Sequence, residues 1–183
     1  MSDELLLRHC SPTVIGLKTA NMFVCWFDSR EQEHSTLQKL NKKLCSKGLR
    51  IIPLRHNEDK VLLYLYRPSK LKRDLKDAQA DRLLQSCGYS CGNTNLCIVQ
   101  LIKRLGENKE FPHEIGLFLG YPPEDVSGFI ENKAQCSKCV GCWKVYGDVE
   151  KAQMTFEKYK RCTELCCSLA AKGVSIERLA ACY

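Results

Sequence analysis

Residues 61–66 constrain the fold most, because they are apolar on both of the faces that alternate along a β-strand. A strand of this kind belongs in the middle of a sheet that is covered on both sides. Residues 49–55 predict a preceding strand, and the polar segment 56–59 has the right length for a hairpin loop. Residues 21–27 are aromatic and β-branched enough for a further strand. The sequence therefore predicts a small antiparallel sheet.

Helical spacing of apolar residues dominates from residue 68 onward. Nearer the N-terminus, residues 3–9 predict a short helix that stops before Pro12, because the residue before a proline is pushed out of the α region. Asp28 or Ser29 can cap the helix that follows the first strand. We expect a mixed α/β (α+β) fold with a sheet of three or four strands and about seven helices. Without internal repeats or a long linker, residues 1–183 are expected to form a single domain.

The length and composition indicate that disulfide bonds are not needed. A chain of 183 residues, 44% of them hydrophobic, can bury a core without covalent staples. The N-terminus carries acidic residues and only a short apolar run, so a secretion signal is not expected. Charges recur too often for the roughly 20 apolar residues of a membrane span. A cytoplasmic location is therefore expected.

Thirteen cysteines must then be explained in a reducing compartment. The number is odd, so the chain cannot pair all of them internally, and ten of the thirteen follow residue 86. In such a compartment a cysteine-rich pattern more often indicates metal binding or redox chemistry than disulfides. We expect reduced thiols, some of which are candidate metal ligands.

The net charge of +7 permits attraction to nucleic acid or to acidic partners. The basic residues of segments 39–50 and 70–76, however, are interleaved with leucines at helical spacing. This pattern favours the solvated face of an amphipathic helix, and no aromatic stacking motif accompanies the charge. Nucleic-acid binding is not expected, whereas an unidentified protein partner remains an open alternative.

Cys136, Cys139 and Cys142 form a C-x2-C-x2-C run between a predicted helix and a short predicted strand. Two-residue spacers let successive thiolates converge on one ion, and the same spacing supplies ligands to iron–sulfur clusters and to zinc. These three cysteines are the candidate metal ligands, and an iron–sulfur cluster or zinc is the candidate cofactor. The alternative is that they are small, semi-buried residues without a ligand.

A fourth metal ligand has to come from elsewhere in the chain. The candidates are Cys87, Cys91 and Cys97, and also Cys10, Cys162, Cys166 and Cys182, although Cys97 also fits the core face of a helix. Cys162 and Cys166 lie four residues apart on a long predicted helix, so that both face one side. Core packing is the preferred interpretation of that pair, because unpaired cysteine is commonly buried.

His113 and Glu114 are candidate catalytic residues in the sequence Pro-His-Glu. Adjacent helical residues point about 100° apart, so Glu114 is poorly placed to orient the imidazole of His113. If they act, we expect them to act separately, and a structural role near a helix N-terminus is an equal alternative. Cys10 is a candidate nucleophile if His113 serves as its base. No third orienting residue can be named for that pair.

Several segments together resemble the bacterial domain-of-unknown-function family 3793. They are residues 9–13 with Gly16 and Lys18, residues 62–68, residues 111–126, which contain the Pro-His-Glu motif, and residues 141–148. The resemblance covers nearly the whole chain and implies no activity, because the family looks uncharacterised. It also implies relatives in anaerobic bacteria, some of them near ferrous-iron uptake genes.

Three functions follow from these observations. The first is a metal- or iron–sulfur-binding accessory protein in iron or redox handling, built on Cys136, Cys139 and Cys142. The second is a thiol-dependent enzyme with Cys10 as nucleophile and His113 as base. The third is a non-catalytic interaction module, so whether the chain is an enzyme is left open.

Overall fold

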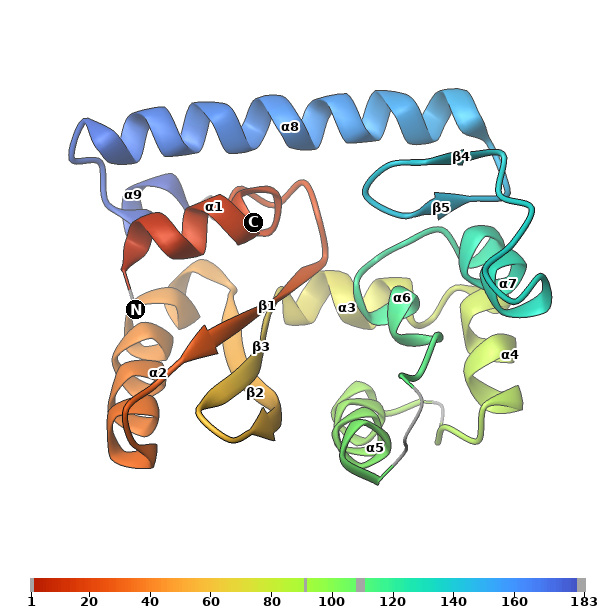
Figure 1. Cartoon of the computed structure of the whole chain (residues 1–183), viewed down its shortest axis with the longest axis horizontal. Coiled ribbons are helices and arrows are strands. Elements are labelled where there is room, and N and C mark those ends of the chain that lie inside the picture. The colour runs from red at the N-terminus through yellow and green to blue at the C-terminus, as the bar shows by residue number, and fades with distance from the viewer. Residues whose placement is uncertain (1, 91, 108–110, 181–183) are drawn as a thin grey trace. The chain divides into compact units, whose positions relative to one another are not determined.

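The structure is a computed structural model that describes residues 2–90, 92–107 and 111–180 (Figure 1). The chain divides into two compact units, one made of Met1–Ser69 with Tyr159–Tyr183 and the other of Lys70–Lys158. We call them unit 1 and unit 2 and describe each by itself. A compact unit need not fold alone, so the single domain expected from the sequence stays a prediction.

Unit 1 contains a three-stranded antiparallel sheet of β1 (Ala20–Trp26), β2 (Arg50–Asn57) and β3 (Lys60–Tyr66), in the order β1-β3-β2. The central position of β3 confirms what its two apolar faces predict. Leu63 and Leu65 on one face and Tyr64 on the other are all fully buried. The β2–β3 hairpin is also confirmed.

Helices pack on this sheet to form the core of unit 1. They are α1 (Asp3–Val14), α2 (Arg30–Leu44), the C-terminal part of α8 (Val149–Ala171) and α9 (Ile176–Leu179), and a 3₁₀ turn (Cys45–Lys47) without buried residues follows α2. Ser29 caps α2 by accepting a hydrogen bond from the Gln32 backbone N–H at 3.1 Å. The core combines leucines, aromatic rings and thiols, among them Leu6, Leu7, Leu37, Leu40, Phe23, Leu63, Leu65, Cys162 and Ile176.

The predicted end of the first helix is wrong, because α1 continues through Pro12 to Val14. Proline disfavours a helical residue before it, but this is a preference that burial can override. Ser11, Pro12 and Thr13 are all buried, and the Ser11 hydroxyl donates to the Leu7 carbonyl. Packing of the last turn therefore outweighs the local cost of the proline.

Arg67 ties the end of β3 to the end of α1. Its side chain is 1% exposed, and its guanidinium donates to the carbonyl oxygens of Thr13 at 2.8 Å and Val14 at 2.6 Å. A third hydrogen bond reaches the carbonyl of Lys47 at 3.1 Å. Carbonyl groups at a helix C-terminus lack partners within the helix, and a cation there is favoured by the helix dipole. Arg67 is thus a structural cation.

Unit 2 is mostly helical and carries a small hairpin. Its elements are α4 (Ala78–Ser86), α5 (Thr94–Glu107), α6 (Ile115–Phe118), α7 (Pro123–Glu131), β4 (Cys139–Val140), β5 (Lys144–Val145) and the N-terminal part of α8, and α3 (Pro68–Asp74) begins at the boundary between the units. With nine α-helices and two antiparallel sheets among the described residues, the fold is α+β. Two of these helices, α6 and α9, are single turns of four residues, which explains why the sequence predicts about seven.

The β4–β5 hairpin contains Cys139 and Cys142, two of the three cysteines of the C-x2-C-x2-C run. Cys139 pairs with Val145, and Val140 pairs with Lys144, in antiparallel register. The sequence predicts the strand near Trp143 but assigns the cysteines to a loop. Within the described ranges, no helix is long and apolar enough to cross a membrane.

Candidate functional site

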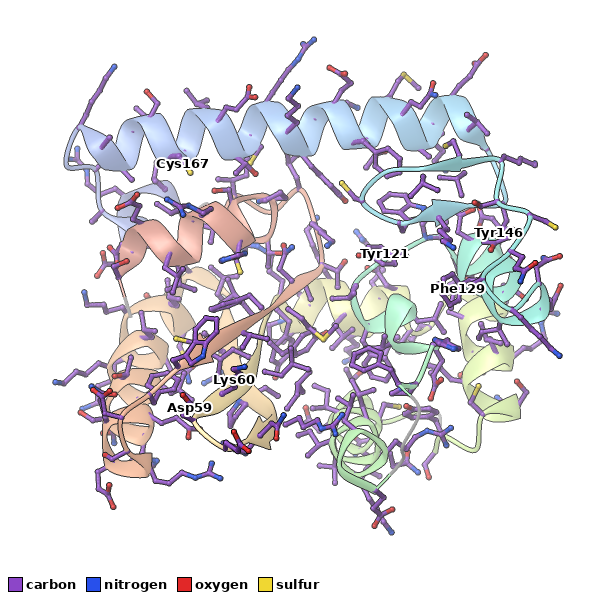
Figure 2. The ribbon with its side chains drawn as sticks, viewed as in Figure 1. Asp59, Lys60, Tyr121, Phe129, Tyr146 and Cys167 are labelled. Carbon is purple, nitrogen blue, oxygen red and sulfur yellow. The ribbon has the colours of Figure 1, made fainter. Side chains whose placement is uncertain are left out.

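A pocket of about 330 Å³ lies within unit 2, between the Pro-His-Glu turn, α6, α7 and the β4–β5 hairpin. Figure 2 shows Tyr121, Phe129 and Tyr146 around these segments. Aromatic rings dominate the lining, and three residues with polar or charged side chains join them. The rings are Phe111, Tyr121, Phe129 and Trp143, and the polar residues are His113, Asp125 and Lys144. This volume falls at the lower end of the range typical of small-molecule sites.

Trp143 anchors one wall of the pocket. Its ring stacks on Tyr121 at a centroid distance of 4.9 Å and meets the edge of Phe156 at 4.6 Å. The Tyr121 hydroxyl donates to the Cys142 carbonyl at 3.3 Å. Burial, and secondarily the Cys142 thiol, raises the pKa of Tyr121 to about 12, so this hydroxyl keeps its proton. The wall is therefore a packed and neutral aromatic surface.

Asp125 holds the hairpin against α7. It is 3% exposed, and its Oδ2 accepts a hydrogen bond from Trp143 Nε1 at 2.6 Å. Its Oδ1 accepts from the backbone N–H groups of Tyr146 and Gly147, both at 2.7 Å. Three donors on one buried carboxylate compensate its charge and fix the Trp143 ring. The first turn of α7, where Asp125 lies, also favours an acid through the helix dipole.

His113 and Lys144 both lie against Phe129 in the pocket lining. The His113 ring meets Phe129 edge-on at a centroid distance of 5.0 Å, and His113 is exposed. Lys144 Nζ lies 6.0 Å from the centre of the same ring and donates to the Ala134 carbonyl at 2.6 Å. Two nitrogen donors thus lie around one aromatic side chain in the pocket lining.

Glu114 turns away from this pocket, as the separation of adjacent residues predicts. It is 4% exposed, its Oε1 lies 2.9 Å from Arg104 Nε, and it accepts a hydrogen bond from the Tyr89 hydroxyl at 3.0 Å. Burial and the nearby Glu114 charge raise the pKa of Tyr89. Glu114 makes no capping hydrogen bond to α6. Its environment is that of a structural ion pair in the interior of unit 2.

Cys139 and Cys142 lie on the hairpin and Cys136 lies just before it, with Cys136 and Cys142 exposed and Cys139 partly buried. Cys136 has a positive φ of 57°, which is uncommon for a residue other than glycine. Throughout the described part of the chain, no three Cys, His, Asp or Glu side chains converge closely enough to hold a metal ion. No disulfide bond joins any two of the eleven described cysteines.

The candidate additional ligands differ in their surroundings. Cys97 is 3% exposed, donates to the Ser90 carbonyl at 3.5 Å, and has a pKa raised by burial. Cys87 ends α4 and is partly buried, with a pKa raised by burial and then by Glu114. Cys91 and Cys182 lie outside the described residues. The environment of Cys97 favours packing in the core of unit 2.

Cys10 lies in the core of unit 1, whereas His113 belongs to unit 2. The thiol is 0% exposed, and burial raises its pKa well above the ordinary value despite the charge of Lys18. A neutral, desolvated thiol is a poor nucleophile. Cys162 and Cys166 share this core at 6% and 3% exposure, which confirms the packing role predicted for them.

Sequence reasoning from the motifs missed the pocket residues Tyr121, Asp125, Trp143 and Lys144 as a site. Phe129, which lies on α7, also lines the pocket. One signal was present, since the segments 111–126 and 141–148 are both long motifs of the same resemblance. Their convergence depends on contacts across 18 to 22 residues, such as those of Asp125, which spacing alone does not reveal.

Comparison with known proteins gives one match. No curated protein and no solved structure matches the chain. A family described as "Protein of unknown function (DUF3793)" matches residues 6–180, which is nearly the whole chain and includes every residue of the pocket. The chain therefore belongs to the DUF3793 family.

Proposed function

We propose that the aromatic pocket of unit 2 is the functional site and that it binds a small, ring-containing molecule. One observation carries the proposal. The two long segments that bear the family resemblance, residues 111–126 and 141–148, supply nearly all of the pocket lining. Phe129 and Val140 are the exceptions, and both lie between the two segments in sequence. Segments that are separate in the chain are thus brought to one concave surface.

The chemistry of the lining supports binding of a ring. Apolar pockets with a few placed polar groups are typical of small-molecule sites. Aromatic pairs contribute about 0.5–1.5 kcal/mol beyond the area that they bury, so the Tyr121 and Trp143 wall favours a flat ligand. The wall is also fixed in advance, because Asp125 and Phe156 hold Trp143 in place. A preformed site loses less conformational entropy when it binds.

Ligand-observed NMR with a library of ring-containing fragments tests the proposal. Val140 is 69% exposed at the pocket, so Val140→Trp is expected to block the site. Met154 is 58% exposed on α8 outside the lining, so Met154→Trp is the matched control. We expect fragments that bind the wild type and Met154→Trp but not Val140→Trp. A library without binders, or binders that Val140→Trp retains, would contradict the proposal.

A second candidate function is metal or iron–sulfur binding in iron or redox handling. Its support is the placement of Cys139 and Cys142 on one short hairpin and of Cys136 just before it, with two of the three thiols exposed. Metal binding can order its own ligands, since thiolates often converge only when the ion is present. Whether zinc or an iron–sulfur cluster would bind depends on a fourth ligand.

Anaerobic reconstitution separates the metal proposal from the pocket. The protein is incubated with zinc, or with ferrous iron and sulfide, then desalted and analysed for bound metal and visible absorbance. We expect stoichiometric metal in the wild type and in Cys167→Ser, a partly buried thiol on α8, and loss in Cys139→Ser. Wild-type protein that retains no metal would end this candidate and leave the pocket unaffected.

A further inference from the structure

We infer that the ligand of the unit 2 pocket is a planar aromatic carboxylate whose ring lies on the Tyr121 and Trp143 wall and whose carboxylate meets His113 and Lys144. This inference rests on the proposed function and names the ligand class of the same site. The observation that carries it is the distribution of charge in the pocket lining, where His113 and Lys144 offer donors and the charge of Asp125 is compensated.

Positive and hydrogen-bonding groups are concentrated at one wall. His113 and Lys144 both line the pocket and both lie against Phe129, at 5.0 Å between rings and 6.0 Å from Nζ to the ring centre. An ammonium group has three N–H donors, and the Ala134 carbonyl takes one of them. An imidazole N–H is a further donor. Two donor groups against the same aromatic side chain match the two oxygens of a carboxylate.

The negative group of the lining does not oppose an anion. Asp125 is the acid among the described residues that line the pocket, and it is 3% exposed. Both of its oxygens accept hydrogen bonds of 2.6–2.7 Å, from Trp143 Nε1 and from two backbone N–H groups. Its charge is therefore directed into the protein and compensated there. A cationic ligand would be repelled by Lys144 and would find no uncompensated acid in the lining. The aromatic rings alone would have to attract it.

The apolar part of the pocket selects for a flat ring. Tyr121 and Trp143 stack with an interplanar angle of 29°, and the hydroxyl of Tyr121 already donates to the Cys142 carbonyl. This wall offers ring surface and few polar contacts. A volume of about 330 Å³ limits the ligand to a small ring system. Ring and carboxylate are thus recognised by different residues of the lining.

Isothermal titration with three probes that share a naphthalene ring and differ in charge tests the ligand class. The probes are 1-naphthoate, the neutral 1-naphthamide and the cationic 1-naphthylmethylamine. A hydrogen bond to a charged group contributes about 1.5–3 kcal/mol, so we expect naphthoate to bind at least about tenfold more tightly than naphthamide. The cationic probe is expected to bind most weakly. Equal affinities for naphthoate and naphthamide, or tightest binding of the cation, would overturn the inference but leave the proposed pocket function standing.

The Lys144→Met variant tests the residue that carries the charge. We expect about tenfold weaker binding of naphthoate, with naphthamide binding retained as proof that the pocket is still folded. Lys151→Met removes an exposed lysine of α8 outside the lining and is expected to leave both affinities unchanged. If Lys144→Met weakens the binding of the two probes equally, the charge of Lys144 does not recognise the carboxylate and the inference is wrong. If neither the fragments nor any probe binds the wild type, the proposed function itself fails.

Discussion

At the scale of single residues, thiols of one chemical type occupy very different surroundings in this chain. Cys142 is exposed on the hairpin and Cys136 just before it, whereas Cys10 and Cys162 lie in the core of unit 1. Burial raises the pKa of both core thiols. The thiolate is the reactive form of cysteine. Burial therefore lowers the reactivity of the core thiols twice, by blocking access of the reagent and by raising the pKa.

Alkylation of the native protein is therefore expected to follow this order. Brief iodoacetamide treatment at mildly alkaline pH should modify Cys136 and Cys142 first and leave Cys10 and Cys162 unmodified until the protein unfolds. Peptide mapping by mass spectrometry measures the order. Early modification of Cys10 would contradict its placement in the core and revive the thiol-enzyme hypothesis.

Asp125 is the single side chain on which the pocket depends most. In Asp125→Asn one carboxylate oxygen becomes an N–H₂ group. In either orientation of the amide, this group meets an N–H donor, either that of Trp143 or those of the Tyr146 and Gly147 backbone. We expect the free energy of unfolding to fall by about 2 kcal/mol, because a buried charge-assisted hydrogen bond is lost. Urea denaturation followed by circular dichroism measures it.

The neighbouring Glu124 provides the matched control for Asp125. It lies in the same first turn of α7 but is exposed. Glu124→Gln removes the same charge from the same turn and is expected to change the free energy of unfolding by no more than about 0.5 kcal/mol. Equal effects of the two substitutions would show that the helix dipole, and not the hydrogen bonds of Asp125, is responsible.

At the scale of elements, α7 and the residues after β5 approach each other closely. Gly128 lies inside α7, and a Cβ atom built there would come within 2.5 Å of Tyr146 Cβ and Cγ. Gly128→Ala is therefore expected to lower the free energy of unfolding by about 1–3 kcal/mol through overpacking. The same urea denaturation measures this loss.

Gly106 in α5 is the control for the backbone effect of alanine. A Cβ built at Gly106 meets no atom within 4 Å. Alanine restricts the unfolded chain and favours the helix, so Gly106→Ala is expected to raise the free energy of unfolding by about 0.5 kcal/mol. If Gly128→Ala also stabilises the protein, α7 and Tyr146 do not pack as closely as described.

The elements that sequence reasoning predicts are those with a strong local signal. The continuous apolar run of residues 61–66, the Ser29 cap and the apolar face of α5 are each set by residues close together in sequence. The β4–β5 hairpin has strands of two residues, which are too short to show an alternating pattern. The last turn of α1 depends on burial by distant segments, so Pro12 misleads a local prediction.

At the scale of the whole molecule, the sequence supports the fold class and the family but not the site. The α+β class follows from counting strands and helices, and membership follows from a match over residues 6–180. The pocket depends on Asp125 and Trp143, which meet across 18 residues. From the sequence, His113 is a candidate because it is titratable, whereas the aromatic residues that line the pocket with it have the pattern of core residues. Only the folded chain shows that these residues share one cavity.

The two tryptophans of the chain provide the most direct test of whether the unit 2 pocket is the binding site. Trp143 lines the pocket, whereas Trp26 is 58% exposed on β1 in unit 1. Protein labelled with ¹⁵N gives one indole N–H signal from each, and the Trp26→Phe variant assigns them. Adding 1-naphthoate is expected to move the Trp143 signal saturably and to leave the Trp26 signal in place. A Trp143 signal that stays still, or that moves no more than the Trp26 signal, would contradict the assignment of the pocket as the binding site.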